Sequence, residues 1–164
     1  MTLHDAGTPK ITPFLWFDDK AEEAAKFYVS IFKNSTILSG GRDDEEGTDA
    51  EWTVTSVTFQ LDGQRFIALN GGPHFTFSPA ISFFVNCETQ QEVDELWDKL
   101  SAGGETSRCG WLKDKYGLSW QIVPSVLGDL LQDDDPEKSE RTMQAMLAME
   151  KLDIGRLQQA HDHG

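Results

Sequence analysis

One pattern of predicted elements occurs twice in this chain of 164 residues. An apolar strand, an amphipathic helix and several strands occupy residues 11–72, and the same kinds of element return in the same order over residues 80–125. Such internal similarity indicates a duplicated structural unit. In the first copy, Asp62-Gly63 joins two strand-like runs, and a two-residue Asp-Gly link makes its neighbours antiparallel. The sequence therefore predicts two related α+β modules rather than an alternating α/β fold.

The first copy begins with Ile11–Phe17, an apolar run typical of a buried strand. Asp18-Asp19 can cap the helix that follows, whose apolar residues recur at intervals of three and four. The polar, glycine-containing segment Gly40–Asp49 predicts an exposed loop. Trp52–Leu61, rich in Val, Thr and Phe, predicts a strand, and Gln64–Asn70 predicts its hairpin partner.

The second copy repeats this order with clearer helix signals. Ile81–Cys87 predicts a strand, and Thr89 with Glu92 has the spacing of a capping box. Gly103-Gly104 predicts the end of the helix. The segment Cys109–Pro124 then predicts a closing hairpin, in which a turn with Asp and Gly separates two strands.

A helical extension is predicted over residues 126–164. Val126–Leu131 suggests a short helix, Pro136 stands at the first position of a second helix, and Asp153 can cap a third. Helices with an apolar face must bury that face. A neighbouring subunit and the chain's own sheet are both open as its partner.

The composition excludes several classes of function. A net charge of −14 and a pI near 4.5 argue against nucleic acid or an anionic membrane as partner. No apolar run approaches the roughly 20 residues of a membrane helix, and residues 1–10 lack the features of a secretory signal. Two cysteines are too few for a disulfide scaffold. We therefore expect a cytoplasmic protein.

The paired modules, with Phe27-Tyr28 in the first helix, resemble the vicinal-oxygen-chelate superfamily of glyoxalase I, bleomycin-resistance proteins and extradiol dioxygenases. Three phrases narrow the likeness to the PhnB-like proteins, also named the 3-demethylubiquinone-9 3-methyltransferase domain family: Thr12–Phe17, Ala68–Phe75 and Cys109-Gly110-Trp111. The likeness extends from residue 11 to about residue 157.

This resemblance implies an α+β fold in which two βαβββ modules form a curled, mostly antiparallel sheet around a cavity, within a homodimer. The predicted organisation is an N-terminal tail over residues 1–10 and a glyoxalase-like domain over residues 11–125, with modules of about 11–72 and 80–125. The helical extension over residues 126–164 completes the chain.

The resemblance also implies where a metal would bind. Metal-binding members of the superfamily place ligands at four strand positions, which fall near Pro13, Asn70 and Ala80–Ser82 and on Gln121. None of these offers His or Glu, and Gln121 is a neutral amide where the hairpin pattern has Glu. Asn and Gln carbonyls bind Ca²⁺ mostly beside carboxylates. We therefore expect no catalytic metal and no cofactor.

Aromatic side chains and amides suggest a small-molecule cavity, because pockets commonly combine an aromatic lining with a few polar groups. The predicted ligand-binding residues are Trp16, Asn70, Gly71, His74, Trp111, Trp120 and Gln121. Core packing is the alternative for the three tryptophans. For Asn70–His74 the alternative is a connector that needs unusual backbone angles.

Cys109 is the candidate for a catalytic nucleophile, since the neighbouring cations Arg108 and Lys113 would raise its thiolate fraction. The alternative is a small core residue on a strand. Lys113 and Asp114 otherwise suggest turn and surface charges. The terminal His161-Asp162-His163 is expected to lie on a frayed end.

Three functions remain open. The first is binding of an unidentified small molecule without a catalytic metal. The second is an enzyme, either a lyase or dioxygenase as in the superfamily, or a methyltransferase as the family label suggests. Methyl transfer is disfavoured because no nucleotide-type glycine loop follows a strand. The third is a structural dimer whose helical extension recruits a partner.

Overall fold

The computed structural model describes residues 8–40 and 56–163. The chain divides into two units, residues 1–76 and residues 77–164, and each contains one four-stranded sheet. Most of the predicted loop Gly40–Asp49 lies outside the described residues, as do the first four residues of the strand predicted over Trp52–Leu61.

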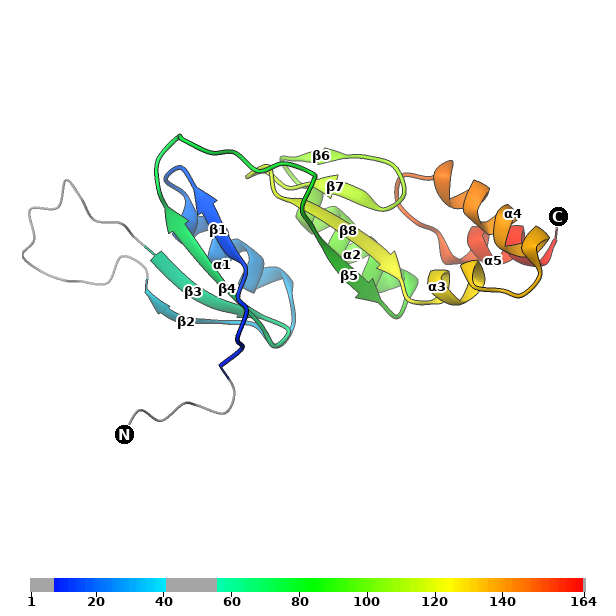
Figure 1. Ribbon diagram of the computed structural model, residues 1–164, viewed down its shortest axis with the longest axis horizontal. Helices are drawn as coiled ribbons and strands as arrows, with labels where there is room; N and C mark the ends of the chain where they lie inside the picture. The colour runs from blue at the N-terminus through cyan, green and yellow to red at the C-terminus, as the bar shows by residue number, and fades with distance from the viewer. Residues whose placement is uncertain (1–7, 41–55, 164) are drawn as a thin grey trace, which may run out of the picture. The chain divides into compact units, whose positions relative to one another are not determined.

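The first unit is a βαβββ module (Figure 1). In its sheet the order is β1-β4-β3-β2, with β1 parallel to β4 and the other pairs antiparallel. The elements are β1 (Phe14–Phe17), α1 (Ala21–Ile31), β2 (Thr36–Gly40), β3 (Ser56–Leu61) and β4 (Gln64–Asn70). The βαβββ pattern implied by the resemblance includes β2, although no residue range had been assigned to it.

The predicted hairpin between β3 and β4 is confirmed, and backbone geometry explains it. Asp62 has φ +45° and Gly63 has φ +85°, the left-handed values that a two-residue hairpin turn requires. The buried side of the hairpin packs on α1, where Phe59 stacks between Tyr28 and Phe66 with ring centroids 6.2 and 5.3 Å apart. Aromatic burial of this kind supplies much of the stability of a small module.

The helix α1 is capped differently from the prediction. Asp18 and Asp19 make no cap, and the helix begins at Ala21. The Ala21 N–H instead donates to Oδ1 of Asn70 at 2.8 Å. This is possible because Asn70 is the last residue of β4 and pairs with Phe17, the last residue of β1. An unpaired N–H of the first turn is thus satisfied from a distant strand.

The second unit repeats the module with the same strand order, β5-β8-β7-β6, and the same parallel outer pair. Its elements are β5 (Ser82–Cys87), α2 (Gln90–Ser101), β6 (Glu105–Thr106), β7 (Trp111–Lys113) and β8 (Ser119–Pro124). The predicted α+β fold with two βαβββ modules is confirmed. In both sheets two of the three strand pairs are antiparallel.

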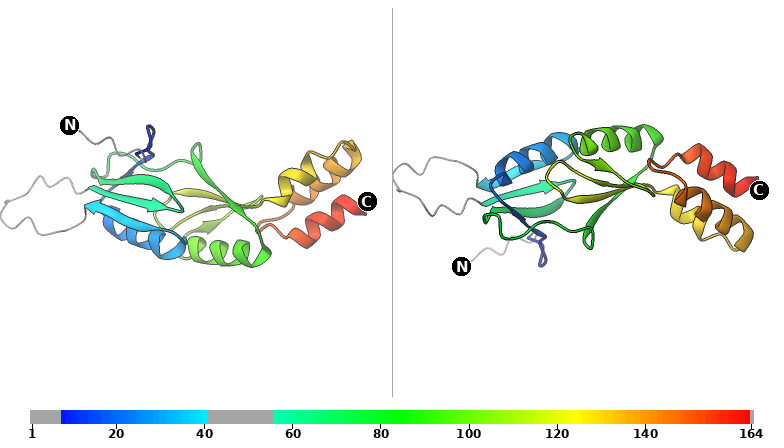
Figure 2. Two further views of the ribbon diagram at one scale, coloured as in Figure 1. Left: turned by 90° about the horizontal axis from the view of Figure 1, so that it is seen from below. Right: turned by 90° about the horizontal axis from the view of Figure 1, so that it is seen from above.

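The capping box of α2 is confirmed, except that the Glu92 carboxylate binds the N–H of Glu88 instead of that of Thr89. Oγ1 of Thr89 accepts the Glu92 N–H at 3.2 Å, as predicted, while the Glu92 carboxylate accepts the N–H of Glu88 at 2.9 Å. Figure 2 shows that α1 and α2 each cover one face of their own sheet. The opposite side of each sheet is called its open face below.

The loop that closes the β7–β8 hairpin contradicts one prediction. Asp114 is not a surface charge, because only 2% of it is exposed. Its Oδ1 accepts the N–H groups of Tyr116 and Leu118 at 2.8 and 3.1 Å, and its Oδ2 accepts Nε1–H of Trp120 at 2.9 Å. Three donors compensate the burial of the carboxylate, so Asp114 organises the five-residue loop.

The helical extension packs within the second unit. It contains α3 (Val126–Leu131), α4 (Pro136–Leu147) and α5 (Ile154–Asp162). Pro136 is the first residue of α4 and Asp153 caps α5, both as predicted. Its apolar face forms one buried cluster with the end of β8: Val123, Leu127, Met149, Leu152 and Leu157. The face is therefore covered by the chain's own second module.

The chain end is held rather than frayed, contrary to the prediction. His161 is only 9% exposed and lies within α5. Its Nδ1 is 2.8 Å from Asp162 Oδ1 and its Nε2 is 2.9 Å from Asp133 Oδ2. None of the helices in the described ranges has the length and apolar character that crossing a bilayer requires.

Candidate functional site

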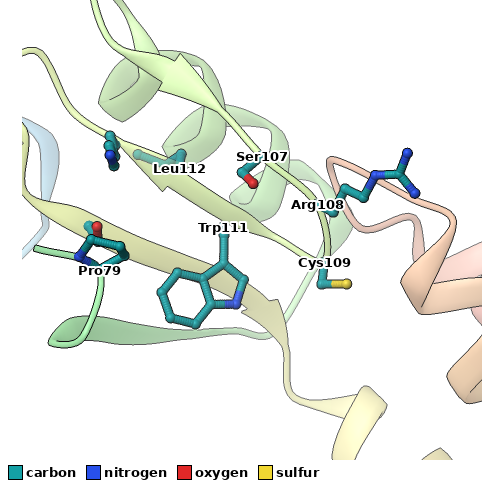
Figure 3. A pocket seen from close by; sticks show the side chains of 8 residues that line it. Pro79, Ser107, Arg108, Cys109, Trp111 and Leu112 are labelled. Carbon is teal, nitrogen blue, oxygen red and sulfur yellow. The ribbon is translucent and has the colours of Figure 1, made fainter.

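A pocket of about 270 Å³ lies in the second module, at the start of β7 and β8 (Figure 3). Strand residues, the turn before β7 and the segment before β5 line it. The lining residues are Pro79, Ser107, Arg108, Cys109, Trp111, Leu112, Lys113 and Ser119. All of these lining residues belong to the second unit, residues 77–164.

The register of the β7–β8 hairpin arranges the side chains of the open face in rows. Lys113 pairs with Ser119, and Trp111 pairs with Gln121. Directly opposed side chains of an antiparallel pair lie on the same face about 5 Å apart. The register therefore brings an ammonium group beside a hydroxyl in one row, and an indole beside an amide in the next.

Ser119 is the most unusual member of this group. It is 1% exposed, and its Oγ has no hydrogen-bond partner among the described residues. A buried hydroxyl without a partner is unfavourable by about 1–3 kcal/mol. Ser119 is also one of the residues that line the pocket.

Gln121 does not line the pocket, but it is held beside it. Its Nε2 donates to Oγ of Ser82 at 2.9 Å, across the parallel pair formed by β5 and β8. Phe84 pairs with Gln121 from the other side and is 55% exposed. The amide is thus oriented by a fixed partner and flanked by two aromatic residues, Phe84 and Trp111.

Two predicted binding residues of the second module differ in burial. Trp111 is half-buried on the open face, and its ring borders the pocket (Figure 3). Trp120 is 2% exposed, packs against Phe83 with tilted rings whose centroids are 5.5 Å apart, and donates to Asp114. Its contacts are those of a core residue, which is the alternative that the sequence left open for the tryptophans.

The predicted binding residues of the first module form a local structure of their own. Nε1–H of Trp16 donates to the carbonyl of Gly72 at 2.9 Å, and the edge of its ring meets Phe75 at 5.0 Å. A Cβ on Gly71 would lie 2.2 Å from that ring. Gly71 is thus required by close packing against Trp16, while His74 is exposed.

The repeat also corrects the position equivalent to Gln121. Gly71 N–H donates to the last carbonyl of β1, as Ser125 N–H donates to the last carbonyl of β5. Gly71 and Ser125 are therefore equivalent positions of the two modules. Four residues before each of them stand Ile67 and Gln121, so the equivalent of Gln121 in the first module is Ile67 and not Asn70. Ile67 has no donor atom. Within the described residues, no three His, Cys, Asp or Glu side chains gather closely enough to hold a metal ion.

Cys109 lies in a turn and not on a strand. It has φ +60° and precedes Gly110 at φ +80°, and these left-handed values lead the chain into β7. The N–H groups of Cys109 and Gly110 donate to the carbonyls of Met149 and Glu150, each at 2.8 Å. Cys109 is among the residues that line the pocket, although Figure 3 shows its sulfur pointing away from the Trp111 ring. The backbone of the same turn holds the segment between α4 and α5.

The sequence did not single out Lys113 and Ser119 as site residues. A signal for them was present, because the hairpin loop spans residues 114–118 and counting outward from it pairs Lys113 with Ser119. The unsatisfied hydroxyl of Ser119 had no such signal, since it depends on burial by surrounding side chains.

Comparison with known protein families matches residues 9–123 to the family described as 3-demethylubiquinone-9 3-methyltransferase. This match covers both modules. The chain belongs to that family. The predicted resemblance to the PhnB-like, 3-demethylubiquinone-9 3-methyltransferase domain family is therefore confirmed.

Solved structures agree with this family and fold. The PhnB protein of Bacillus cereus is 42% identical, with a TM-score of 0.63, over 71% of this family member and 100% of that chain. Protein PA1353 of Pseudomonas aeruginosa is 18% identical, with a TM-score of 0.58, over 71% of this chain and 98% of its own.

The fosfomycin resistance protein FosX of Listeria monocytogenes is 14% identical, with a TM-score of 0.51, over 74% of this family member and 97% of that chain. At this identity FosX, like PA1353, supports the fold alone. No curated protein matches the chain.

Proposed function

We propose that this family member binds a small molecule in the pocket of its second module and does so without a catalytic metal. The observation that carries the proposal is the pocket of about 270 Å³, which is lined by Trp111 and by Ser119, whose hydroxyl has no partner among the described residues. Pockets for small molecules combine an apolar wall with a few placed polar groups. The volume suits a ligand of one or two rings.

The side chains of the duplicated frame support the absence of a metal from this function. Gln121 offers a neutral amide whose NH₂ group is engaged with Ser82. Its counterpart in the first module, Ile67, offers no ligand atom. Divalent metals in catalytic sites are held mainly by imidazole and carboxylate groups. These residues do not fit a catalytic divalent ion, and no step of the proposal uses one.

A fragment screen tests the proposal. One-ring and two-ring compounds are screened by thermal shift with wild-type protein, and hits are compared with Trp111→Ala. A ligand that raises the melting temperature of the wild type should lose most of its effect in this variant. Leu147→Ala is the matched control, because Leu147 is an exposed apolar residue on α4 (51% exposed). Failure of a broad screen to produce any hit would contradict the proposal.

Methyl transfer is the competing function, because the family description names it. Such a reaction needs a place for the methyl donor. The paired glycines Gly71-Gly72 follow β4 but lead into a connector, and Gly71 is packed against Trp16. Calorimetry with S-adenosylmethionine separates the two functions. Binding with a defined stoichiometry would favour methyl transfer, and no heat of binding is expected.

The proposal includes a homodimer in the cytoplasm. Large apolar side chains are exposed on the described chain, among them Phe14 at 56% and Phe84 at 55%. Both are on strands that border the open faces, and such residues are common at protein interfaces. Light scattering after size-exclusion chromatography should give twice the chain mass of 18.4 kDa. A mass near 18 kDa would remove the dimer from the account.

A further inference from the structure

We propose that the ligand of this pocket is a planar apolar molecule that carries an oxyanion, such as an aromatic carboxylate. The inference rests on the proposed function and names its ligand class. In this arrangement the ring of the ligand packs on Trp111, and the oxyanion lies between Nζ of Lys113 and Oγ of Ser119.

The buried hydroxyl is the first observation. Buried polar side chains in native proteins nearly always have a partner, so an exception calls for an explanation. Ser119 Oγ has none among the described residues, and Ser119 is one of the residues that line the pocket. A serine hydroxyl can donate one hydrogen bond. An oxygen atom of a ligand would accept it and remove the penalty of the unsatisfied group.

The ammonium group of Lys113 is the second observation. Because it is positively charged, it favours a ligand whose hydrogen-bond acceptor is an anion. Lys113 is directly opposite Ser119 on the same face and also lines the pocket. In the part of the chain that the structure describes, Lys113 forms no ion pair. Glu105 pairs with Lys113 from β6, but its carboxylate is exposed and lies beyond 4.0 Å of the ammonium group. A hydrogen bond with a charged partner is stronger than a neutral one.

The walls of the pocket are the third observation. The Trp111 ring and Pro79 border it from β7 and from the segment before β5 (Figure 3). A flat apolar body fits beside an indole, since stacked rings gain energy beyond their buried area. Arg108 also lines the pocket, but Figure 3 shows its side chain extending away from the Trp111 ring. We therefore assign the anion to Lys113.

The test uses two probes of one shape. 1-Naphthoate carries the anion and 1-naphthamide is its neutral counterpart, and both are titrated into ¹⁵N-labelled protein followed by NMR. Naphthoate should bind about tenfold more tightly, as one charge-assisted hydrogen bond contributes roughly 1.4 kcal/mol or more. Lys113→Met should remove this preference while naphthamide binds as before. Ser119→Ala should weaken naphthoate binding several-fold.

Controls keep the result specific to the pocket. Lys99→Met removes an exposed ammonium group from α2 and should leave both affinities unchanged. Glu105→Gln removes the carboxylate that opposes Lys113 and should tighten naphthoate binding. The spectrum of each unliganded variant shows whether it is folded.

The outcomes separate this inference from the proposed function. Equal affinity for the two probes, unchanged by Lys113→Met, would overturn the oxyanion and leave small-molecule binding intact. If neither probe shifts any resonance at millimolar concentration, both are overturned. Loss of naphthoate binding in Lys99→Met as well as in Lys113→Met would show a general charge effect and would also overturn the inference.

Discussion

The two modules have the same strand order and the same register, yet their hairpins and open faces differ. In the first module a two-residue turn, Asp62-Gly63, closes the hairpin through its backbone angles. In the second module a five-residue loop is organised by the buried carboxylate of Asp114. The short turn is therefore determined by two backbone conformations, whereas the longer loop is held by the hydrogen bonds of one side chain.

The open faces differ at equivalent positions of the repeat. Arg65 is the counterpart of Ser119, and each carries a buried polar atom without a partner among the described residues, Nε and Oγ respectively. Gln60 pairs with Arg65, whereas Lys113 pairs with Ser119. One backbone frame therefore presents one cation and one neutral polar group in each module, with their positions exchanged. Side chains, and not topology, set the chemistry of each face.

The largest effect should come from removing the organiser of the second hairpin. Asp114→Ala leaves two backbone N–H groups and the indole of Trp120 unsatisfied. We expect a loss of about 3 kcal/mol in the free energy of unfolding. Asp62→Ala should lose less than about 1 kcal/mol, because it changes only a left-handed turn residue. Chemical denaturation of both variants measures the difference, and equal losses would break the comparison.

Close packing distinguishes a second pair of equivalent residues. Gly71→Ala would place a Cβ 2.2 Å from the Trp16 ring and displace it, with a loss of about 2 kcal/mol. Ser125→Ala, at the same point of the second module, changes an exposed side chain and should be within about 0.5 kcal/mol of wild type. Denaturation curves decide, and a neutral Gly71→Ala would refute the packing argument.

The helix caps give a third contrast. Asn70→Ala removes a cap that comes from β4, and Thr89→Ala removes a cap next to its own helix. Each should lose about 1 kcal/mol. Only Asn70→Ala should also increase amide hydrogen exchange where β4 meets α1, because it unlinks a strand from a helix. Exchange that rises equally near both helix starts would contradict this distinction.

The helical extension belongs to the second module alone. Its stability should depend on pH, because His161 contacts the carboxylates of Asp162 and Asp133. Hydrogen bonds that the His161 ring donates to the carboxylates of Asp162 and then Asp133 raise the pKa of His161 above its usual range. The pKa of Asp162 is lowered chiefly by His161, and that of Asp133 by the Asp135 N–H and then by His161. The pair of carboxylates and the imidazolium therefore stabilise the folded protein together.

The directions of these pKa shifts define the pH range in which the contacts stabilise the folded protein. A raised pKa gives stability that is complete below the unfolded value of about 6.5 and is lost as pH rises through the folded pKa. Lowered carboxyl pKa values give stability that is present above about 3.9 and is lost at lower pH. The melting-temperature difference between wild type and His161→Gln should thus be largest near pH 5.5 and shrink by pH 8.5. His74→Gln is the control, because His74 is exposed and lies in the first unit, and it should follow the wild type.

Local signals in the sequence predicted most of the fold. Asp62-Gly63, Thr89 with Glu92, and Pro136 each determine a turn or a helix start through their own backbone, so their positions were predictable. The cap of α1 was not, because Asn70 lies 49 residues after the N–H that it accepts. The burial of His161 was missed for the same reason, since its partner Asp133 lies 28 residues away in the chain. The partners of Asp114, in contrast, lie within six residues of it, and the sequence analysis missed this local pattern.

The candidate site was predicted only in part. The sequence pointed to Trp111 and Gln121, which register places side by side. It also grouped Trp120 with them, although alternation along β8 directs that residue to the helix-covered side. Whether Trp16, Asn70, Gly71 and His74 bind a ligand remains a prediction. Their local contacts explain why a strand end with two glycines is needed there.

The indole N–H resonances of Trp111 and Trp16 provide the most direct test of the account, because they report on the two modules separately. They are assigned from the spectra of Trp111→Phe and Trp16→Phe and are then followed during titration with 1-naphthoate. The account predicts that the Trp111 resonance shifts and saturates while that of Trp16, which donates to Gly72, stays in place. A shift of Trp16 with Trp111 unchanged would contradict the assignment of the binding site to the second module.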